Sequence, residues 1–118
     1  MRIGTNFVQV AVIDTGVDPE DPILKNRLML DNPASMTDTT GHGTMIAEII
    51  AANTNDQVKI KPYVAFDANG HSTVGALYKA LLSAWGDGAD VINVSASGLG
   101  SSAGLTDLVH RINASGTK

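Results

Sequence analysis

The fold of this chain is decided by the run FVQVAVI at residues 7–13, which stops at the turn-forming sequence DTGVDP at residues 14–19. Only Gln9 interrupts the apolar run, and four of its residues are β-branched. Successive side chains of a strand point to opposite faces, so this run describes a strand that is buried on both faces. Such strands are typical of parallel sheets, and we predict a strand inside a parallel sheet here.

Helical and extended patterns alternate along the rest of the sequence. The predicted helices cover residues 44–52, 74–85 and 105–112, and the remaining predicted strands cover residues 27–30, 58–65 and 91–95. Pro62 indicates an irregular or edge position in its strand. The alternation predicts an α/β fold with a parallel sheet, and it stops where a further strand is expected.

The composition is that of one ordinary globular domain. The 118 residues are 43% hydrophobic and 17% charged with a net charge of −4, which argues against disorder and predicts no binding of nucleic acid or an anionic membrane. The lack of cysteine excludes disulfides, cysteine-bound zinc and a thiol nucleophile. No apolar run approaches the ~20 residues of a membrane-spanning helix, and the first residues do not resemble a signal peptide. The compartment stays open.

Two residues occupy positions where parallel sheets carry functional groups, just beyond the carboxyl ends of the strands. Asp14 ends the first strand, and His42 lies between two glycines at the start of a predicted helix. Taken alone, they are interpreted as a turn-forming aspartate and a surface histidine. Together, with His42 following Asp14 by 28 residues, they match two members of a nucleophilic triad in the order Asp then His. His71 and His110 are expected at solvated positions.

Three segments around these residues resemble motifs of the subtilisin-like serine peptidases, the subtilases. The segment VAVIDTGVD at residues 10–18 is similar to the aspartate motif of that family, GHGT at residues 41–44 to its histidine motif, and ADVINVS at residues 89–95 to its third recurring segment. The resemblance implies a three-layer α/β/α fold with a mainly parallel sheet, of which residues 1–118 would be one partial domain. It also implies serine endopeptidase activity on extended polypeptides.

The resemblance assigns roles to individual residues of this chain. His42 would be the general base and later the general acid, and Asp14 would accept a hydrogen bond from the imidazole and fix its tautomer. The backbone of an extended substrate would be bound on one side by Ser95, Ala96, Ser97 and Gly98, and on the other by Asn69 and Gly70 in the loop at residues 67–71. We carry over no cofactor and no metal ligand, since the loop at residues 52–58 is short and the histidines do not cluster with carboxylates.

The sequence departs from the family at the nucleophile. A complete subtilase has its serine in a Gly-Thr-Ser-x-Ala segment, and none of the eight serines in this sequence has that context. The segment that leads to the oxyanion-binding asparagine is also missing, and Asn93 is not its counterpart. Nucleophile and oxyanion stabilisation carry most of the catalysis. We therefore expect the 118-residue chain alone to be inactive, with the serine supplied by a complementary chain or a C-terminal part.

Two other functions stay open at this point. The chain is alternatively a non-catalytic, subtilisin-like module that binds a protein partner. An aspartate phosphotransferase would also have an aspartate after its first strand, but that chemistry favours a second acid two residues later, where this chain has Gly16. No phosphate-binding or dinucleotide-binding glycine motif is present, so nucleotide binding has no support.

Overall fold

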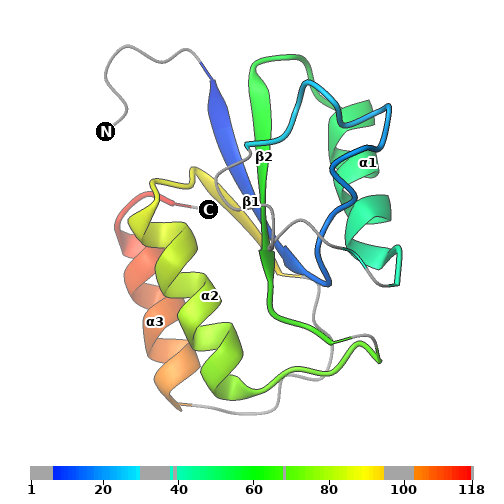
Figure 1. Cartoon of the computed structure of the whole chain (residues 1–118). Helices are drawn as coiled ribbons and strands as arrows, with labels where there is room; N and C mark the ends of the chain where they lie inside the picture. Colours follow the sequence, from blue (N-terminus) through cyan, green and yellow to red (C-terminus); the bar gives the residue numbers. More distant parts are fainter. Residues whose placement is uncertain (1–6, 30–37, 39, 68, 95–102, 118) are drawn as a thin grey trace.

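Three parallel strands form the centre of the chain in the computed structural model, which describes residues 7–29, 38, 40–67, 69–94 and 103–117 (Figure 1). In chain order the elements are β1 (Val8–Asp14), α1 (His42–Ala52), β2 (Val58–Val64), α2 (Val74–Gly86), β3 (Val91–Val94) and α3 (Ala103–Ala114). Over these residues the strand order is β2-β1-β3. The run at residues 7–13 therefore belongs to the middle strand, as its pattern predicts.

The register of the strands places their carboxyl ends at one edge of the sheet. Along β2 the pairing runs from Val8 with Val58 to Asp14 with Val64, and along β3 Ile13 pairs with Val94. Asp14 consequently stands at this edge, at the end of the central strand. The residues that directly follow β1 and β2 contact it there.

Helices cover both faces of the sheet, with α1 on one side and α2 and α3 on the other (Figure 1). Val10 and Val12 of β1 pack in the core on the α1 side, together with Val17, Leu24, Ala47, Ala51 and Ile60. Ile13 packs in the core on the other side, together with Phe66, Leu77, Ala80, Leu81, Leu105, Leu108 and Ile112. Each face of the sheet packs against a core, and β1 therefore carries apolar side chains on both of its faces. The predicted three-layer α/β/α fold is confirmed.

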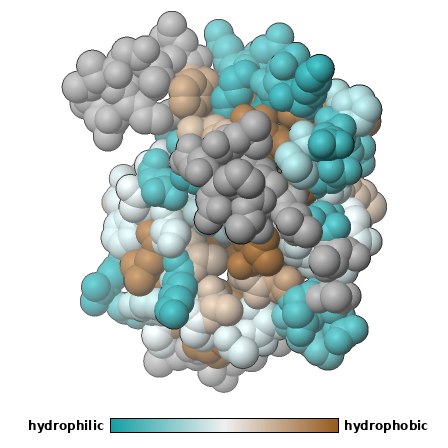
Figure 2. Space-filling view, in the orientation of Figure 1, coloured by the Kyte–Doolittle hydropathy of each residue, from teal (hydrophilic) through white to brown (hydrophobic). Residues whose placement is uncertain are grey.

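The helices α2 and α3 carry some apolar side chains on their outer surfaces as well. Val74, Leu82 and Val109 are between 42% and 50% exposed. In Figure 2 the hydrophobic residues on this side form small patches, while hydrophilic residues gather around α1 and the turn before β2. Over the described residues, no helix is long and apolar enough to cross a membrane.

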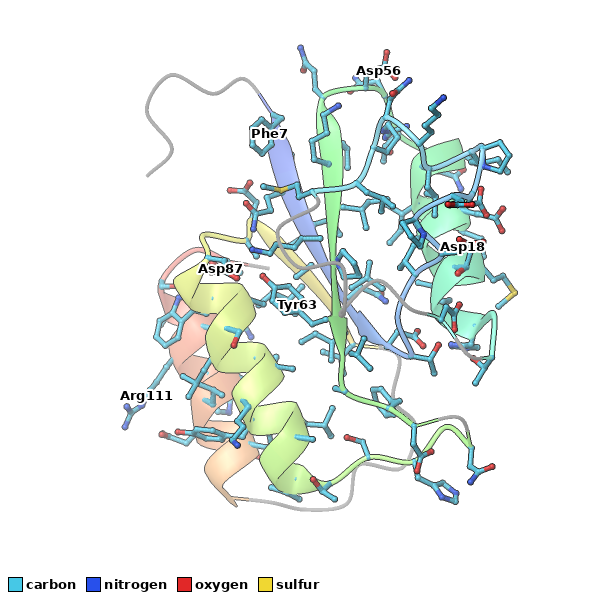
Figure 3. The ribbon with its side chains drawn as sticks, in the orientation of Figure 1. Phe7, Asp18, Asp56, Tyr63, Asp87 and Arg111 are labelled. Atoms are coloured by element: carbon cyan, nitrogen blue, oxygen red, sulfur yellow. The ribbon has the colours of Figure 1, made fainter. Side chains whose placement is uncertain are left out.

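Polar contacts fasten β2 to the end of α2. Tyr63 on β2 lies near Asp87, the residue that follows α2 (Figure 3), and its hydroxyl donates a hydrogen bond of 2.6 Å to Asp87 Oδ2. Lys61 Nζ lies 3.1 Å from the same oxygen. Burial raises the pKa of Asp87, but these contacts with Tyr63 and Lys61 lower it by more, so that the net shift is downward.

Several predicted elements differ from the structure in their bounds; the helix predicted over residues 105–112, for example, is observed at Ala103–Ala114. The helix predicted over residues 44–52 begins at His42, two residues earlier. Of the strand predicted over residues 27–30, the described residues 27–29 form a single bridge, between Leu28 and Ile60, and residue 30 lies outside the described residues. This bridge also explains how β2 accommodates Pro62. On the side of β2 that faces away from β1, Ile60 is the only described residue that pairs with a neighbour. Pro62 has no N–H group, but over the described residues no neighbour on that side needs a hydrogen bond from it.

Candidate active site

Asp14 is held in place at the carboxyl edge of the sheet by backbone groups. Its Oδ1 accepts a hydrogen bond of 2.7 Å from the amide of Thr15. Its backbone carbonyl accepts hydrogen bonds from the amides of Ala65 and Phe66, at 2.9 and 3.2 Å, where the chain leaves β2. The backbone of Asp14 is therefore tied to the end of β2 and its carboxyl group to the next amide of the chain, and its side chain is only 2% exposed.

His42 lies directly against this carboxyl group. Its Nδ1 is 2.9 Å from Asp14 Oδ1 and 3.0 Å from Oδ2. A carboxylate only accepts hydrogen bonds, so this contact places a proton on Nδ1 and leaves Nε2 of the neutral ring with a free lone pair. The His42 side chain is 49% exposed, and over the described residues Nε2 has no hydrogen-bond partner. The pair thus presents an oriented base to solvent.

The start of α1, and with it the position of His42, depends on residues outside the helix. The N-cap residue Gly41 has a φ of +86° and no side chain to accept hydrogen bonds. The first three helical amides need acceptors because they have no partner within the helix. They donate to side chains from elsewhere: His42 to Thr40 Oγ1 at 3.0 Å, Gly43 to Thr15 Oγ1 at 3.1 Å, and Thr44 to Asp38 Oδ2 at 3.0 Å.

Asp38 is the centre of this hydrogen-bond network. Besides the Thr44 amide it accepts hydrogen bonds from the Thr44 hydroxyl at 2.6 Å, the Gly41 amide at 2.9 Å and the Thr15 hydroxyl at 2.9 Å. Burial raises the pKa of Asp38, but the hydrogen bonds from Thr44, Gly41 and Thr15 lower it by more, from 3.8 to about 2. The carboxyl group is therefore ionised at neutral pH, next to the positive end of the α1 dipole.

The sequence analysis missed Asp38, Thr15 and Thr40. One signal was available: a helix that begins after glycine has no capping side chain of its own, so an acceptor close upstream is to be expected. Asp38 stands three residues before Gly41. The contribution of Thr15 had no comparable signal, because it reaches the helix through space from the end of β1.

The two glycines beside His42 serve different purposes. A Cβ atom at Gly43 would overlap the backbone carbonyl oxygen of Gly16, so α1 approaches the turn after β1 as closely as a glycine allows. A Cβ atom at Gly41 would have no atom within 4 Å, and glycine is favoured there by its positive φ. The close approach at Gly43 brings the first residue of the helix within reach of Asp14.

A cavity of about 320 Å³ opens beside the pair of Asp14 and His42. Its lining residues are Asp14, Thr15, Thr40, His42, Phe66, Asn69 and Gly70. The loop that contributes Asn69 and Gly70 is organised by Asp67, whose carboxylate accepts the amides of Asn69 and His71, both at 2.9 Å. The hydrogen bond from the His71 amide is the main reason why the pKa of Asp67 is lowered. The site is thus a shallow pocket with a buried acid, a half-exposed base and a polar loop.

Comparison with known proteins gives this geometry a family context. The sequence profile of the subtilase family matches residues 5–117. The chain belongs to the subtilase family. It is 34% identical to a thermophilic serine proteinase of Bacillus sp. (strain AK1) and 32% identical to subtilisin DY of Bacillus licheniformis. These matches cover 93% and 92% of this chain, but 30% and 44% of the two relatives.

Solved structures give the same result for the fold. A cold-adapted subtilisin-like serine proteinase superposes with a TM-score of 0.76 at 26% identity, over 97% of this chain and 46% of that protein. A lanthipeptide protease superposes with a TM-score of 0.64 at 35% identity, over 79% of this chain and 29% of that protein. The chain thus spans less than half the length of these relatives. Both the resemblance to subtilases and the fold class that it implies are confirmed.

The structure of this subtilase brings together some of the residues that the sequence analysis singled out. Asp14 and His42 are in contact, and Asn69 and Gly70 line the same pocket. The predicted substrate-binding residues Ser95, Ala96, Ser97 and Gly98 lie outside the described residues. His71 and His110 are exposed, as predicted. Over the part of the chain that the structure describes, no three histidine, aspartate or glutamate side chains gather as metal ligands would.

Proposed function

We propose that residues 1–118 form part of one subtilisin-type serine endopeptidase domain, in which Asp14 and His42 act with a serine supplied from outside this sequence. The observation that carries the proposal is the contact of His42 Nδ1 with both oxygens of the buried Asp14, at 2.9 and 3.0 Å. Membership of the subtilase family supports it. No serine of this sequence stands in the Gly-Thr-Ser-x-Ala context of the nucleophile.

In this mechanism His42 moves a proton between the nucleophile and the leaving group. Its Nε2 accepts the proton of the serine hydroxyl as the serine oxygen attacks the peptide carbonyl. The resulting imidazolium donates that proton to the leaving amine when the peptide bond breaks. Water then attacks the acyl-enzyme, and His42 again takes a proton and returns it to the serine oxygen.

Asp14 supports each of these proton transfers without taking the proton itself. Its hydrogen bond to Nδ1 holds the tautomer in which Nε2 is the base, and its charge stabilises the imidazolium that forms. Because Asp14 is buried and already accepts the Thr15 amide, its position is set before a substrate arrives. The attraction between the two groups is stronger there than it would be in water.

We also propose that the substrate is an extended polypeptide bound in the pocket beside His42. Asn69 and Gly70 line that pocket, and Gly70, which has no side chain, has a φ of +76°. Pairing of the substrate with backbone groups of this loop and of Ser95–Gly98 would be largely independent of substrate side chains. The residues at positions 95–98 are small, which would suit such an approach.

The test is an intact mass spectrum of the purified native protein before and after reaction with a fluorophosphonate probe for serine hydrolases. We expect the probe on a companion polypeptide or a C-terminal extension and not on any residue of 1–118. We expect His42→Ala to abolish labelling, while His110→Ala, the same change at an exposed position of α3, leaves it unchanged. Labelling of a serine within 1–118 would contradict the proposed source of the nucleophile. A folded sample that takes up no probe would favour the non-catalytic binding module.

A further inference from the structure

The carboxylate of Asp38 is bonded both to the residue that follows β1 and to the start of α1. On the β1 side it accepts the hydroxyl of Thr15 at 2.9 Å. On the α1 side it accepts the amides of Gly41 and Thr44 at 2.9 and 3.0 Å. Thr15 follows Asp14 directly in the chain, and Gly41 and Thr44 lie on either side of His42. The carboxylate thus contacts the neighbours of both partners and neither partner itself.

Simple helix capping does not require this arrangement. A capping residue needs only to accept amides of the first turn. Here the Thr15 hydroxyl donates to Asp38 and also accepts the amide of Gly43 at 3.1 Å. The strand end and the helix start are therefore joined by a closed network in which Asp38 is the only charged member. Both halves of the Asp14–His42 contact are attached to that network.

The structure assigns Asp38 the role of a positioning residue, which holds His42 Nδ1 against Asp14 by joining Thr15 to the first turn of α1. This inference rests on the proposed function for its consequence in catalysis, but the positioning itself concerns only residues of this chain. An asparagine at position 38 would not replace it. Both oxygens of Asp38 accept hydrogen bonds, and the amide nitrogen of asparagine would face a donor on one of the two sides.

The test compares Asp38→Asn with Asp56→Asn, the same chemical change in the exposed turn before β2, at the opposite edge of the sheet (Figure 3). The readout in the 118-residue chain is the side-chain NMR spectrum of His42. We expect Asp38→Asn to lose the Nδ1–H signal of the Asp14 contact or to broaden it by exchange, with β2 and α2 signals unchanged. Asp56→Asn should leave the spectrum unchanged. An intact Nδ1–H signal in Asp38→Asn would overturn the inference.

A second pair of variants decides the question if Asp38→Asn does not fold. Thr15→Val keeps the shape of the side chain but removes its hydroxyl, whereas Thr15→Ser keeps the hydroxyl. We expect loss of the Nδ1–H signal in the first variant and its recovery in the second. Equal spectra for the two variants would contradict the role of the network.

The catalytic consequence is measured on the assembled protein. It can be refuted independently of the positioning role. A displacement of the base by about 1 Å is expected to lower kcat roughly 100-fold, so Asp38→Asn should lower kcat by that order while KM changes little. If the NMR result holds and the parent protein takes up no probe, the positioning stands and the peptidase proposal falls. If the parent is active and Asp38→Asn keeps its kcat, the positioning role is overturned.

Discussion

Gly43 on α1 packs against the backbone of Gly16 so closely that a Cβ atom at Gly43 would overlap the Gly16 carbonyl oxygen. The contact joins the first turn of α1 to the turn that follows Asp14. We therefore expect Gly43→Ala to push α1 away from the strand end and to destabilise the chain by about 1–3 kcal/mol, the range for overpacking. In Gly41→Ala the new Cβ atom would have no atom within 4 Å. The positive φ at this position alone should lower the free energy of unfolding by about 1–2 kcal/mol. Urea unfolding measures both.

The two glycine variants differ most clearly in what they do to His42. We expect Gly43→Ala to abolish the NMR signal of the His42 Nδ1 proton, because α1 moves relative to Asp14. Gly41→Ala is expected to keep the signal in the folded fraction. Retention of the signal in Gly43→Ala would show that the close approach to Gly16 does not position the histidine.

Asp14→Asn tests the orienting role of the buried acid. The asparagine amide would donate to His42 Nδ1, so the ring proton would move to Nε2, and the histidine could no longer accept a proton from a serine. We expect kcat of the assembled protein to fall by a factor on the order of 10⁴. Asp56→Asn serves as the control. Undiminished hydrolysis by Asp14→Asn would exclude the proposed mechanism.

The fold could be predicted from the sequence because its signals are local. The run at residues 7–13 is apolar on both faces, and in the structure Val12 and Ile13 enter the two cores on opposite sides of the sheet. The segment at residues 27–30 misled the prediction for the same reason. Its apolar residues resemble a strand, but over the described residues 27–29 the pairing with β2 is limited to one bridge, between Leu28 and Ile60.

The candidate site was predictable only in part. Asp14 follows a strand pattern and His42 lies between two glycines at the start of a helix pattern. Both features can be recognised in the linear sequence. Asp38 is bonded to Thr15, 23 residues away, and to the helix amides of a segment that has no cap of its own. Such a network depends on where two loops meet in space, and no periodicity of the sequence encodes it.

Substitution of Arg27, which lies away from the candidate site, is expected to lower the stability of the fold strongly. Its side chain is buried and donates to the carbonyls of Val58 and Ala51, at 2.9 and 3.1 Å, and to Thr54 Oγ1 at 2.6 Å. It thus ties the last turn of α1, where a cation is favoured by the dipole, to the start of β2. We expect Arg27→Met to cost about 2–4 kcal/mol because it removes three hydrogen bonds from a charged, buried donor.

The matched control for Arg27 is Lys25→Met, which removes a cation from an exposed position two residues away. Lys25→Met should change the free energy of unfolding by less than about 0.5 kcal/mol. Comparable losses for the two variants in urea unfolding would show that the hydrogen bonds of Arg27 do not stabilise the fold. The probe-labelling rate of folded Arg27→Met should stay unchanged, since the side chain lies near the opposite end of α1 from His42.

The low pKa of Asp38 predicts how stability depends on pH. A carboxyl group with a pKa of about 2 in the folded chain and an ordinary value of 3.8 stabilises the fold at pH values above 3.8. This contribution is lost as the pH falls through 3.8 toward 2. The shift corresponds to about 2 kcal/mol, and solvent screening of this partly exposed group reduces it to about 1–2 kcal/mol.

Asp67 and Asp87 also have lowered pKa values, so the parent chain loses stability in acid for several reasons at once. The contribution of Asp38 is isolated by the difference between the parent chain and Asp38→Asn, in which Asp67 and Asp87 are unchanged. We expect the variant to be less stable by about 1–2 kcal/mol at pH 6 and the difference to shrink toward pH 2. Urea unfolding across this range measures it. A difference that stays constant with pH would mean that Asp38 stabilises the chain by its shape and not by its charge.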